Sequence, residues 1–175
     1  MKPDIEQIRE LASEREEENW AFRERLKGSD TPFEEIDREA RALYRRYSSE
    51  IDCTECGNCC KEMTPVLKGA DIRRISGSLG LSVREVRERY LRYDEDGDIT
   101  FHAKPCPFLS DNICTIYESR PDCCRSFPHL HEDGFLYRMD QALKNCPVCP
   151  IVFHVCEDLK EKFGHDSRSS GVSPL

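Results

Sequence analysis

The sequence lacks any apolar run that approaches the ~20 residues of a membrane-spanning helix. Its first residues, MKPDIEQIREL, carry charges throughout and hold no apolar stretch of signal-peptide length. It also lacks a basic excess, since 26 Lys and Arg face 34 Asp and Glu and leave a net charge of −8. A nucleic-acid-binding surface is therefore not expected. We expect a cytoplasmic protein with neither a membrane nor a nucleic acid as its partner.

Apolar residues are also scarce. Only 38% of the 175 residues are hydrophobic, and 34% are charged. A chain of this length has room for one ordinary domain with at most a small appendage, and its core should be thin. Metal crosslinks would offset that shortage of buried apolar surface.

Cysteine, in contrast, is abundant. The chain holds 11 cysteines, an odd number that a disulfide framework would leave unpaired. Four of them stand within the eight residues Cys53-Thr54-Glu55-Cys56-Gly57-Asn58-Cys59-Cys60. In a reducing compartment, thiols at this density indicate metal ligands.

The first three spacings, Cys53-x2-Cys56-x2-Cys59, match a bacterial ferredoxin loop. That loop would place its fourth cysteine at position 63, which is Met63 here. The fourth ligand is then either Cys60 or a remote cysteine. Because adjacent side chains diverge, Cys59 and Cys60 are not expected to bind one metal side by side. They would more easily bind two different centres, or one would bind a centre while the other lies next to that centre without binding it.

A second group of motifs follows in order: CPFL from Cys106, C-x-IY-x2-RP from Cys114, CR-x-FP from Cys124, and a late Cys-Pro at Cys146 or Cys149. Together with CTECGNCC, this string resembles the CxxCxxCC cysteine-cluster family, the YkgJ-type zinc- or iron-chelating proteins. The resemblance spans residues 53 to about 150. A related cysteine cluster occurs in flagellin lysine methylases, but no glycine-rich cofactor loop is visible here, so methylase activity is not carried over.

The resemblance implies eight metal ligands, and Cys146 is the least well matched of them. These are Cys53, Cys56, Cys59, Cys60, Cys106, Cys114, Cys124 and Cys146. Cys123 and Cys156 do not match the family pattern and are expected to be small buried hydrophobic residues. All-thiolate sites suit both zinc and iron–sulfur clusters. The ferredoxin-like spacing, with Gly57 freeing backbone amides to reach sulfur, favours an iron–sulfur cluster, most simply 4Fe-4S.

Helical periodicity marks most of the remaining chain. Residues 1–52 indicate a helical hairpin with a turn near Gly28, whose second helix has a Thr31/Glu34 capping box and Pro32 at its first position. Two short helices are expected over 70–93, the second capped by Ser82 and Glu85, and a last helix over about 150–163. The polar residues 164–175 predict a disordered tail.

Two turn dipeptides predict β-hairpins, Asp96-Gly97 and Asp133-Gly134. The second would place His129 and His131 on one face of a strand. Arg120 and Arg125 lie close in sequence to the cysteines, where their charge would offset that of a thiolate site; alternatively, Arg120 pairs with Glu118 or Asp122.

The predicted fold class is α+β: a small, irregular, metal-stapled domain over 53–163, mainly helical with short β-hairpins, preceded by the helical hairpin of 1–52. Two functions stay open. One is a redox or enzymatic protein that binds an iron–sulfur cluster, with an unidentified redox partner. The other is a structural zinc module that binds a protein partner through its N-terminal helices.

Overall fold

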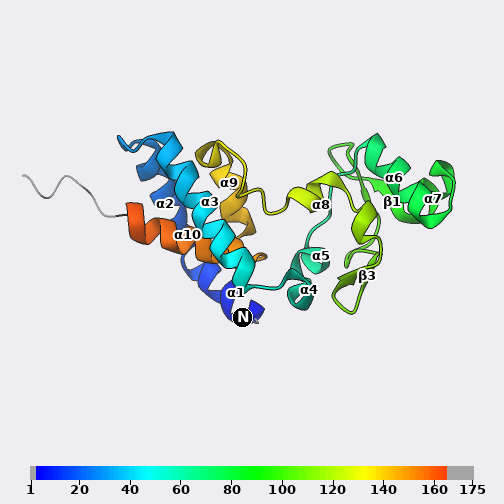
Figure 1. The fold of residues 1–175 in the computed structure, drawn as a ribbon, viewed down its shortest axis with the longest axis horizontal. Helices are drawn as coiled ribbons and strands as arrows, with labels where there is room; N and C mark the ends of the chain where they lie inside the picture. Colours follow the sequence, from blue (N-terminus) through cyan, green and yellow to red (C-terminus); the bar gives the residue numbers. More distant parts are fainter. Residues whose placement is uncertain (1–2, 165–175) are drawn as a thin grey trace, which may run out of the picture. The chain divides into compact units, whose positions relative to one another are not determined.

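The computed structural model describes residues 3–164, in which the chain forms two compact units (Figure 1). The helical unit consists of residues 3–51 and 128–164, and the cysteine-rich unit consists of residues 52–127. The predicted division placed 53–163 in one domain, whereas the contacts group 128–164 with the N-terminal helices. The chain thus leaves the helical unit after Ile51 and rejoins it at Pro128. The predicted tail lies almost entirely outside the described residues.

Five helices form the helical unit, and the expected α+β class with mainly helical content is confirmed. Its α10 packs on α3, while α9 packs on α2 and α3. Buried side chains from all five helices, among them Ile8, Phe22, Ile36, Met139 and Val152, form its core. The helices are α1 (Ile5–Glu14), α2 (Glu16–Lys27), α3 (Phe33–Glu50), α9 (Phe135–Asn145) and α10 (Pro150–Phe163).

The start of α3 differs from the prediction. Pro32 is the residue that precedes the helix, and no side-chain hydrogen bond caps it. The Thr31/Glu34 capping box is therefore wrong. The backbone amide of Thr31 instead donates to the Ser29 hydroxyl at 3.3 Å, within the turn that joins α2 to α3.

The predicted hairpin at Asp133-Gly134 is also wrong, because Gly134 immediately precedes helix α9. The buried carboxylate of Asp37, on α3, accepts hydrogen bonds from the amides of Gly134 at 2.7 Å and Phe135 at 2.8 Å. Helix N-termini have unsatisfied amides, and a carboxylate from a distant part of the chain satisfies them here. His129 and His131 consequently lie in the turn that leads into α9, not on a strand.

The cysteine-rich unit is built from short elements. Its helices are α4 (Cys53–Cys56), α5 (Asn58–Glu62), α6 (Gly69–Leu79), α7 (Val83–Tyr90) and α8 (Asp122–Ser126), with the 3₁₀ helix η1 (Tyr117–Ser119). Its strands are β1 (Leu91–Tyr93), β2 (Ile99–Phe101), β3 (Leu109–Ser110) and β4 (Ile113–Cys114).

Sequence signals located α6, α7 and the first hairpin correctly. The Ser82/Glu85 capping box is present at the start of α7. β1 and β2 pair antiparallel around Asp96-Gly97, with Leu91 opposite Phe101. The antiparallel pair β3–β4 was not predicted. Its turn uses Asp111 and Asn112 at positive φ, a conformation that Asp and Asn tolerate better than most residues.

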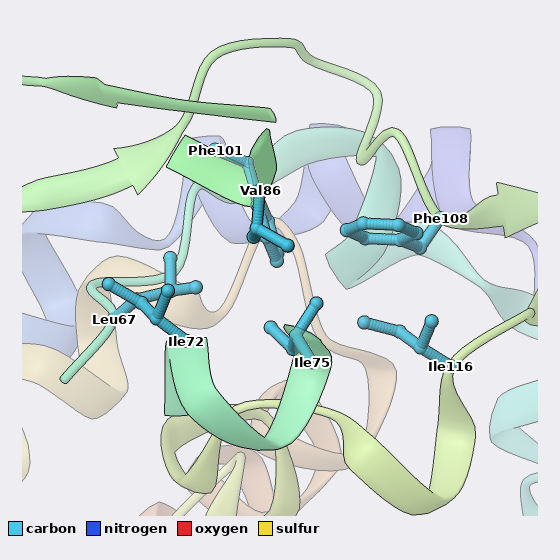
Figure 2. Packing of buried hydrophobic residues seen from close by; sticks show 7 residues of the cluster. All are labelled: Leu67, Ile72, Ile75, Val86, Phe101, Phe108 and Ile116. Atoms are coloured by element: carbon cyan, nitrogen blue, oxygen red, sulfur yellow. The ribbon is translucent and has the colours of Figure 1, made fainter. Parts of the chain in front are cut away.

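The core of the cysteine-rich unit is small (Figure 2). Figure 2 shows the side chains of Ile75, Val86 and Phe101 gathered above α6, with Phe108 and Ile116 beside them. The whole cluster consists of Leu67, Ile72, Ile75, Val86, Phe101, Phe108 and Ile116. Cys106 and Cys114 pack against this cluster, so the apolar core borders the thiols. Among residues 3–164, no helix combines the length and the apolar character that a membrane crossing requires.

Candidate metal centre

The CTECGNCC segment folds as two single-turn helices joined by Gly57. The carboxylate of Asp52 accepts a hydrogen bond from the Thr54 amide at 2.8 Å and so caps α4. Gly57 has φ +60°, which ends α4 and lets α5 begin directly after it. Left-handed φ favours glycine, so this residue sets the direction in which Cys59 and Cys60 leave the turn.

The turn between β3 and β4 contacts the CTECGNCC segment through Asn112. Asn112 Nδ2 donates to the Glu55 carbonyl at 3.1 Å, and a Cβ added at Gly57 would lie 2.9 Å from Asn112 Oδ1. Gly57 is thus required both for its backbone conformation and for the close approach of Asn112. No motif in the sequence predicts this contact.

We expect Gly57→Ala to lower the free energy of unfolding of the cysteine-rich unit by about 1–3 kcal/mol, because alanine is strained at this φ and its methyl group meets Asn112. Denaturant unfolding of the metal-loaded protein measures the change. Gly77→Ala on α6 is the matched control: an added Cβ there meets nothing within 4 Å. That control should be neutral or stabilising by about 0.5–1 kcal/mol. Equal behaviour of the two variants would contradict the prediction.

Backbone hydrogen bonds bring the second group of cysteines to the first. The Cys106 amide donates to the Cys60 carbonyl at 2.8 Å, and the Leu109 amide donates to the Cys106 carbonyl at 3.0 Å. Leu109 pairs in turn with Cys114 across the β3–β4 hairpin. Three of the predicted ligands are therefore linked through consecutive backbone contacts.

The thiols interact electrostatically around Cys60. Its negative charge, when ionised, helps raise the pKa of Cys53, Cys106, Cys114 and Cys124. Burial is the largest cause at Cys106, whose pKa rises to about 11. Cys60 itself has a pKa lowered to about 7, chiefly because the Cys59 thiol hydrogen-bonds to it, with help from the charge of Lys61. Cys60 is therefore the thiol that ionises most readily within this group.

Backbone amides also reach the sulfurs of two predicted ligands, Cys106 and Cys114. The amide of Phe108 donates to Cys106, and the amide of Ile116 donates to Cys114, each from two residues further along the chain. Both hydrogen bonds lower the pKa of the thiol that accepts them, and burial outweighs them. A thiolate stabilised by an amide is the form that binds a metal.

Helix α8 carries the adjacent Cys123 and Cys124. The Cys124 thiol donates a hydrogen bond to Cys123, which raises the pKa of Cys124 and lowers that of Cys123. Cys124 interacts with Cys60 and Cys106, whereas the Cys123 thiol donates to the Val66 carbonyl at 3.3 Å. Cys123 is only partly buried, so the expectation of a buried hydrophobic residue is wrong.

Of the two arginines, Arg120 acts on a predicted ligand as expected, whereas Arg125 contacts backbone carbonyls. The guanidinium of Arg120 lies 3.6 Å from the centre of the Tyr117 ring, and its charge lowers the pKa of Cys114, although burial leaves that pKa raised overall. Arg125 donates to the carbonyls of Glu118 and Arg120 and so holds the turn between η1 and α8. Positive charge is therefore present where a set of thiolates would be negative.

Three further cysteines belong to the helical unit. Cys146, Cys149 and Cys156 are all buried. The Cys146 thiol donates to the Ala142 carbonyl at 3.7 Å and shares a hydrogen bond with Cys156. Cys156 is a buried helix residue, as expected. The role of Cys146 as the eighth ligand stays a prediction.

Seven of the eight predicted ligands thus lie in the cysteine-rich unit: Cys53, Cys56, Cys59, Cys60, Cys106, Cys114 and Cys124. Within residues 3–164, no three His, Cys, Asp or Glu side chains stand at the spacing of ligands around one metal ion. The donor chemistry itself fits a thiophilic metal, because cysteine thiolates are the ligands that zinc and iron–sulfur clusters share.

A small unit with eight cysteines and a core of only seven buried hydrophobic residues is of the kind that cysteine-ligated metals stabilise. The chain belongs to the CxxCxxCC family, described as a "Putative zinc- or iron-chelating domain", whose model matches residues 52–150. This match confirms the resemblance drawn from the cysteine motifs.

The chain is also similar to an uncharacterized protein of Methanocaldococcus jannaschii, with 33% identity over 81 residues. The matched region covers 44% of this chain and 43% of that relative, so the two share less than half of their lengths. No solved structure matches the chain.

Proposed function

We propose that the cysteine-rich unit binds iron as an iron–sulfur cluster and that the protein acts in electron transfer or in a redox reaction. The observation that supports this proposal is that one unit of 76 residues holds eight of the 11 cysteines, among which the charge of Cys60 acts on Cys53, Cys106 and Cys124. A single zinc ion uses four thiolates, so it would leave several of these cysteines without a ligand role. A cluster together with a second site, or with a free thiol facing a substrate, would use them.

Two features favour iron–sulfur chemistry over zinc. The Cys53-x2-Cys56-x2-Cys59 spacing is that of a ferredoxin loop. Amide hydrogen bonds to sulfur, as at Cys106 and Cys114, are among the means by which a protein tunes the potential of a cluster. We propose Cys53, Cys56, Cys59, Cys60, Cys106, Cys114 and Cys124 as ligands from the cysteine-rich unit. Cys146 is proposed as the eighth on the family pattern alone.

A bound cluster would supply reversible one-electron chemistry. The residues of this chain would then hold and tune it. Phe108 and Ile116 would border it with apolar surface, and their amides would donate to the ligand sulfurs. Arg120 would offset part of the negative charge near Cys114. We place this reaction in the cytoplasm, where thiols stay reduced.

Anaerobic purification with iron, zinc and acid-labile sulfide analysis tests the proposal. We expect brown protein that contains iron and sulfide and bleaches with dithionite, because a cluster absorbs visible light and accepts an electron. Replacing Cys53, Cys56 or Cys59 with serine should remove the colour, while Cys156→Ala should keep it. Colourless protein with stoichiometric zinc and no sulfide, even after anaerobic expression with added iron, would overturn the iron–sulfur proposal.

That outcome would support the second candidate, a structural zinc module for protein–protein interaction. One observation favours it: Phe33 and Tyr137, on α3 and α9, are 48% and 75% exposed and lie with their rings 5.6 Å apart. Exposed aromatic side chains are enriched in protein interfaces. The N-terminal helices would then supply part of the surface that binds a partner.

A further inference from the structure

The adjacent thiols of Cys123 and Cys124 meet different surroundings. Cys124 interacts with Cys60 and Cys106, whereas Cys123 donates to the Val66 carbonyl. Successive residues of a helix point about 100° apart around its axis, because one turn contains 3.6 residues. A rotation of α8 by about 100° would therefore bring Cys123 to the direction in which Cys124 now points and turn Cys124 away from it.

Helix α8 cannot fix its own rotation. It contains only five residues, and isolated helices of a single turn are unstable. Its orientation must come from contacts with other parts of the unit, including those at its start.

Those contacts come from Asp71 and Arg74 on α6. Asp71 is 1% exposed, and its two carboxylate oxygens have different partners. Oδ2 accepts from the Lys68 amide at 2.8 Å and so closes the start of α6. Oδ1 accepts from the Asp122 amide at 3.0 Å, at the first residue of α8. One buried side chain thus joins the beginnings of both helices.

Arg74 completes the link. Its Nη2 lies 2.6 Å from Asp71 Oδ1, 2.7 Å from Asp122 Oδ1 and 2.9 Å from the Arg120 carbonyl. It therefore contacts the residues on both sides of Pro121, which immediately precedes α8. Proline restricts the backbone at that point, so the approach to α8 is fixed from α6 and from within the turn.

We propose that Asp71 and Arg74 select Cys124 over Cys123 as the metal ligand by fixing the rotation of α8. They are positioning residues, since neither needs to touch the metal. The proposal rests on the proposed function in one respect, namely that Cys124 is a ligand. It is independent of whether the metal is zinc or iron.

Alkylation of the metal-loaded, full-length protein tests the selection. Anaerobic treatment with iodoacetamide, followed by peptide mass spectrometry, should modify Cys123 and leave Cys124 protected. In Arg74→Ala, Cys124 should lose its protection and Cys123 should gain some. Metal affinity should fall by about 10-fold, the usual lower effect of removing a residue that orients a ligand. Arg73→Ala, on the exposed side of α6, is the matched control and should behave as the unaltered protein.

Two further variants separate positioning from general stability. By itself, Cys123→Ser should leave the metal content unchanged. Combined with Arg74→Ala, it should lower the metal content below that of Arg74→Ala alone, because Cys123 would act as a ligand once α8 can rotate. Arg74→Gln keeps a donor and the fold with less disturbance, and it should shift alkylation in the same direction to a smaller extent. If Cys123 and Cys124 are alkylated in both Arg74 variants as they are in the unaltered protein, the proposal that Arg74 selects Cys124 is overturned.

The outcome for the unaltered protein distinguishes the two proposals. If Cys124 is modified as readily as Cys123 in the loaded protein, Cys124 is not a ligand and the ligand set of the proposed function fails. If Cys124 is protected in the unaltered protein and in both Arg74 variants, that ligand set stands and only the selecting role of Arg74 fails.

Discussion

Cys60→Ser is expected to give the largest single loss of bound metal and soluble protein. Cys60 is the thiol that interacts with Cys53, Cys106, Cys114 and Cys124, and its carbonyl accepts the Cys106 amide. Its substitution would remove a ligand at the point where both groups of cysteines meet. Metal binding to thiolate sites contributes about 10–16 kcal/mol to folding in zinc-finger peptides, so losing such a ligand should leave little of the unit folded.

Metal analysis of the purified protein and its soluble yield measure this effect. Cys156→Ala is the matched control, because Cys156 is a buried cysteine of α10 outside the cysteine-rich unit. It should lose some stability, as a cavity would, but none of the metal. A Cys60→Ser protein with full metal content would show that the centre is built without Cys60.

Metal removal is expected to unfold one part of the chain selectively. Residues 52–127 bury a cluster of seven hydrophobic residues, whereas five helices share the core of the helical unit. A chelator that strips the metal should therefore abolish amide protection over 52–127 and leave α3, α9 and α10 protected. The cysteine motifs alone, which extend to about residue 150, would predict that residues 53–150 unfold together. Because α9 packs on α2 and α3, the segment that is expected to unfold ends at residue 127.

Hydrogen exchange followed by mass spectrometry, before and after chelation, locates the limit. Peptides from α9 serve as the internal control, since they fall inside the family match but within the helical unit. Loss of protection in α9 together with α6 and α7 would mean that the two units unfold as one. Unchanged protection throughout would mean that the metal does not support the fold.

Short sequence motifs predicted the helices and strands whose ends are determined by neighbouring residues. The Ser82/Glu85 box placed α7, Asp96-Gly97 placed the β1–β2 hairpin, and Pro150 marked the start of α10. The hairpin prediction at Asp133-Gly134 was wrong because the same dipeptide can also precede a helix whose first amides are capped by a carboxylate. That carboxylate, Asp37, lies 97 residues from Gly134, so no sequence window could include both.

The same contrast between neighbouring and distant residues applies to the candidate site. Cysteine spacing and the family pattern identified the thiols, which carry their chemistry in their own side chains. The residues that arrange them were missed. Asn112 acts through the Glu55 carbonyl, and Asp71 acts through the Asp122 amide. An Asp or Asn that binds distant backbone looks the same in sequence as one exposed to solvent.

The return of the chain to the helical unit has a consequence for recovery after metal loss. The cysteine-rich unit is an insertion whose two ends are anchored in a structure that does not need the metal, because α3 precedes it, α9 follows it and these helices pack together. An unfolded insertion would then be a tethered loop, not a free chain. Tethering lowers the entropy that must be lost on refolding, so the cysteines would stay at high effective concentration for the next metal or cluster delivered.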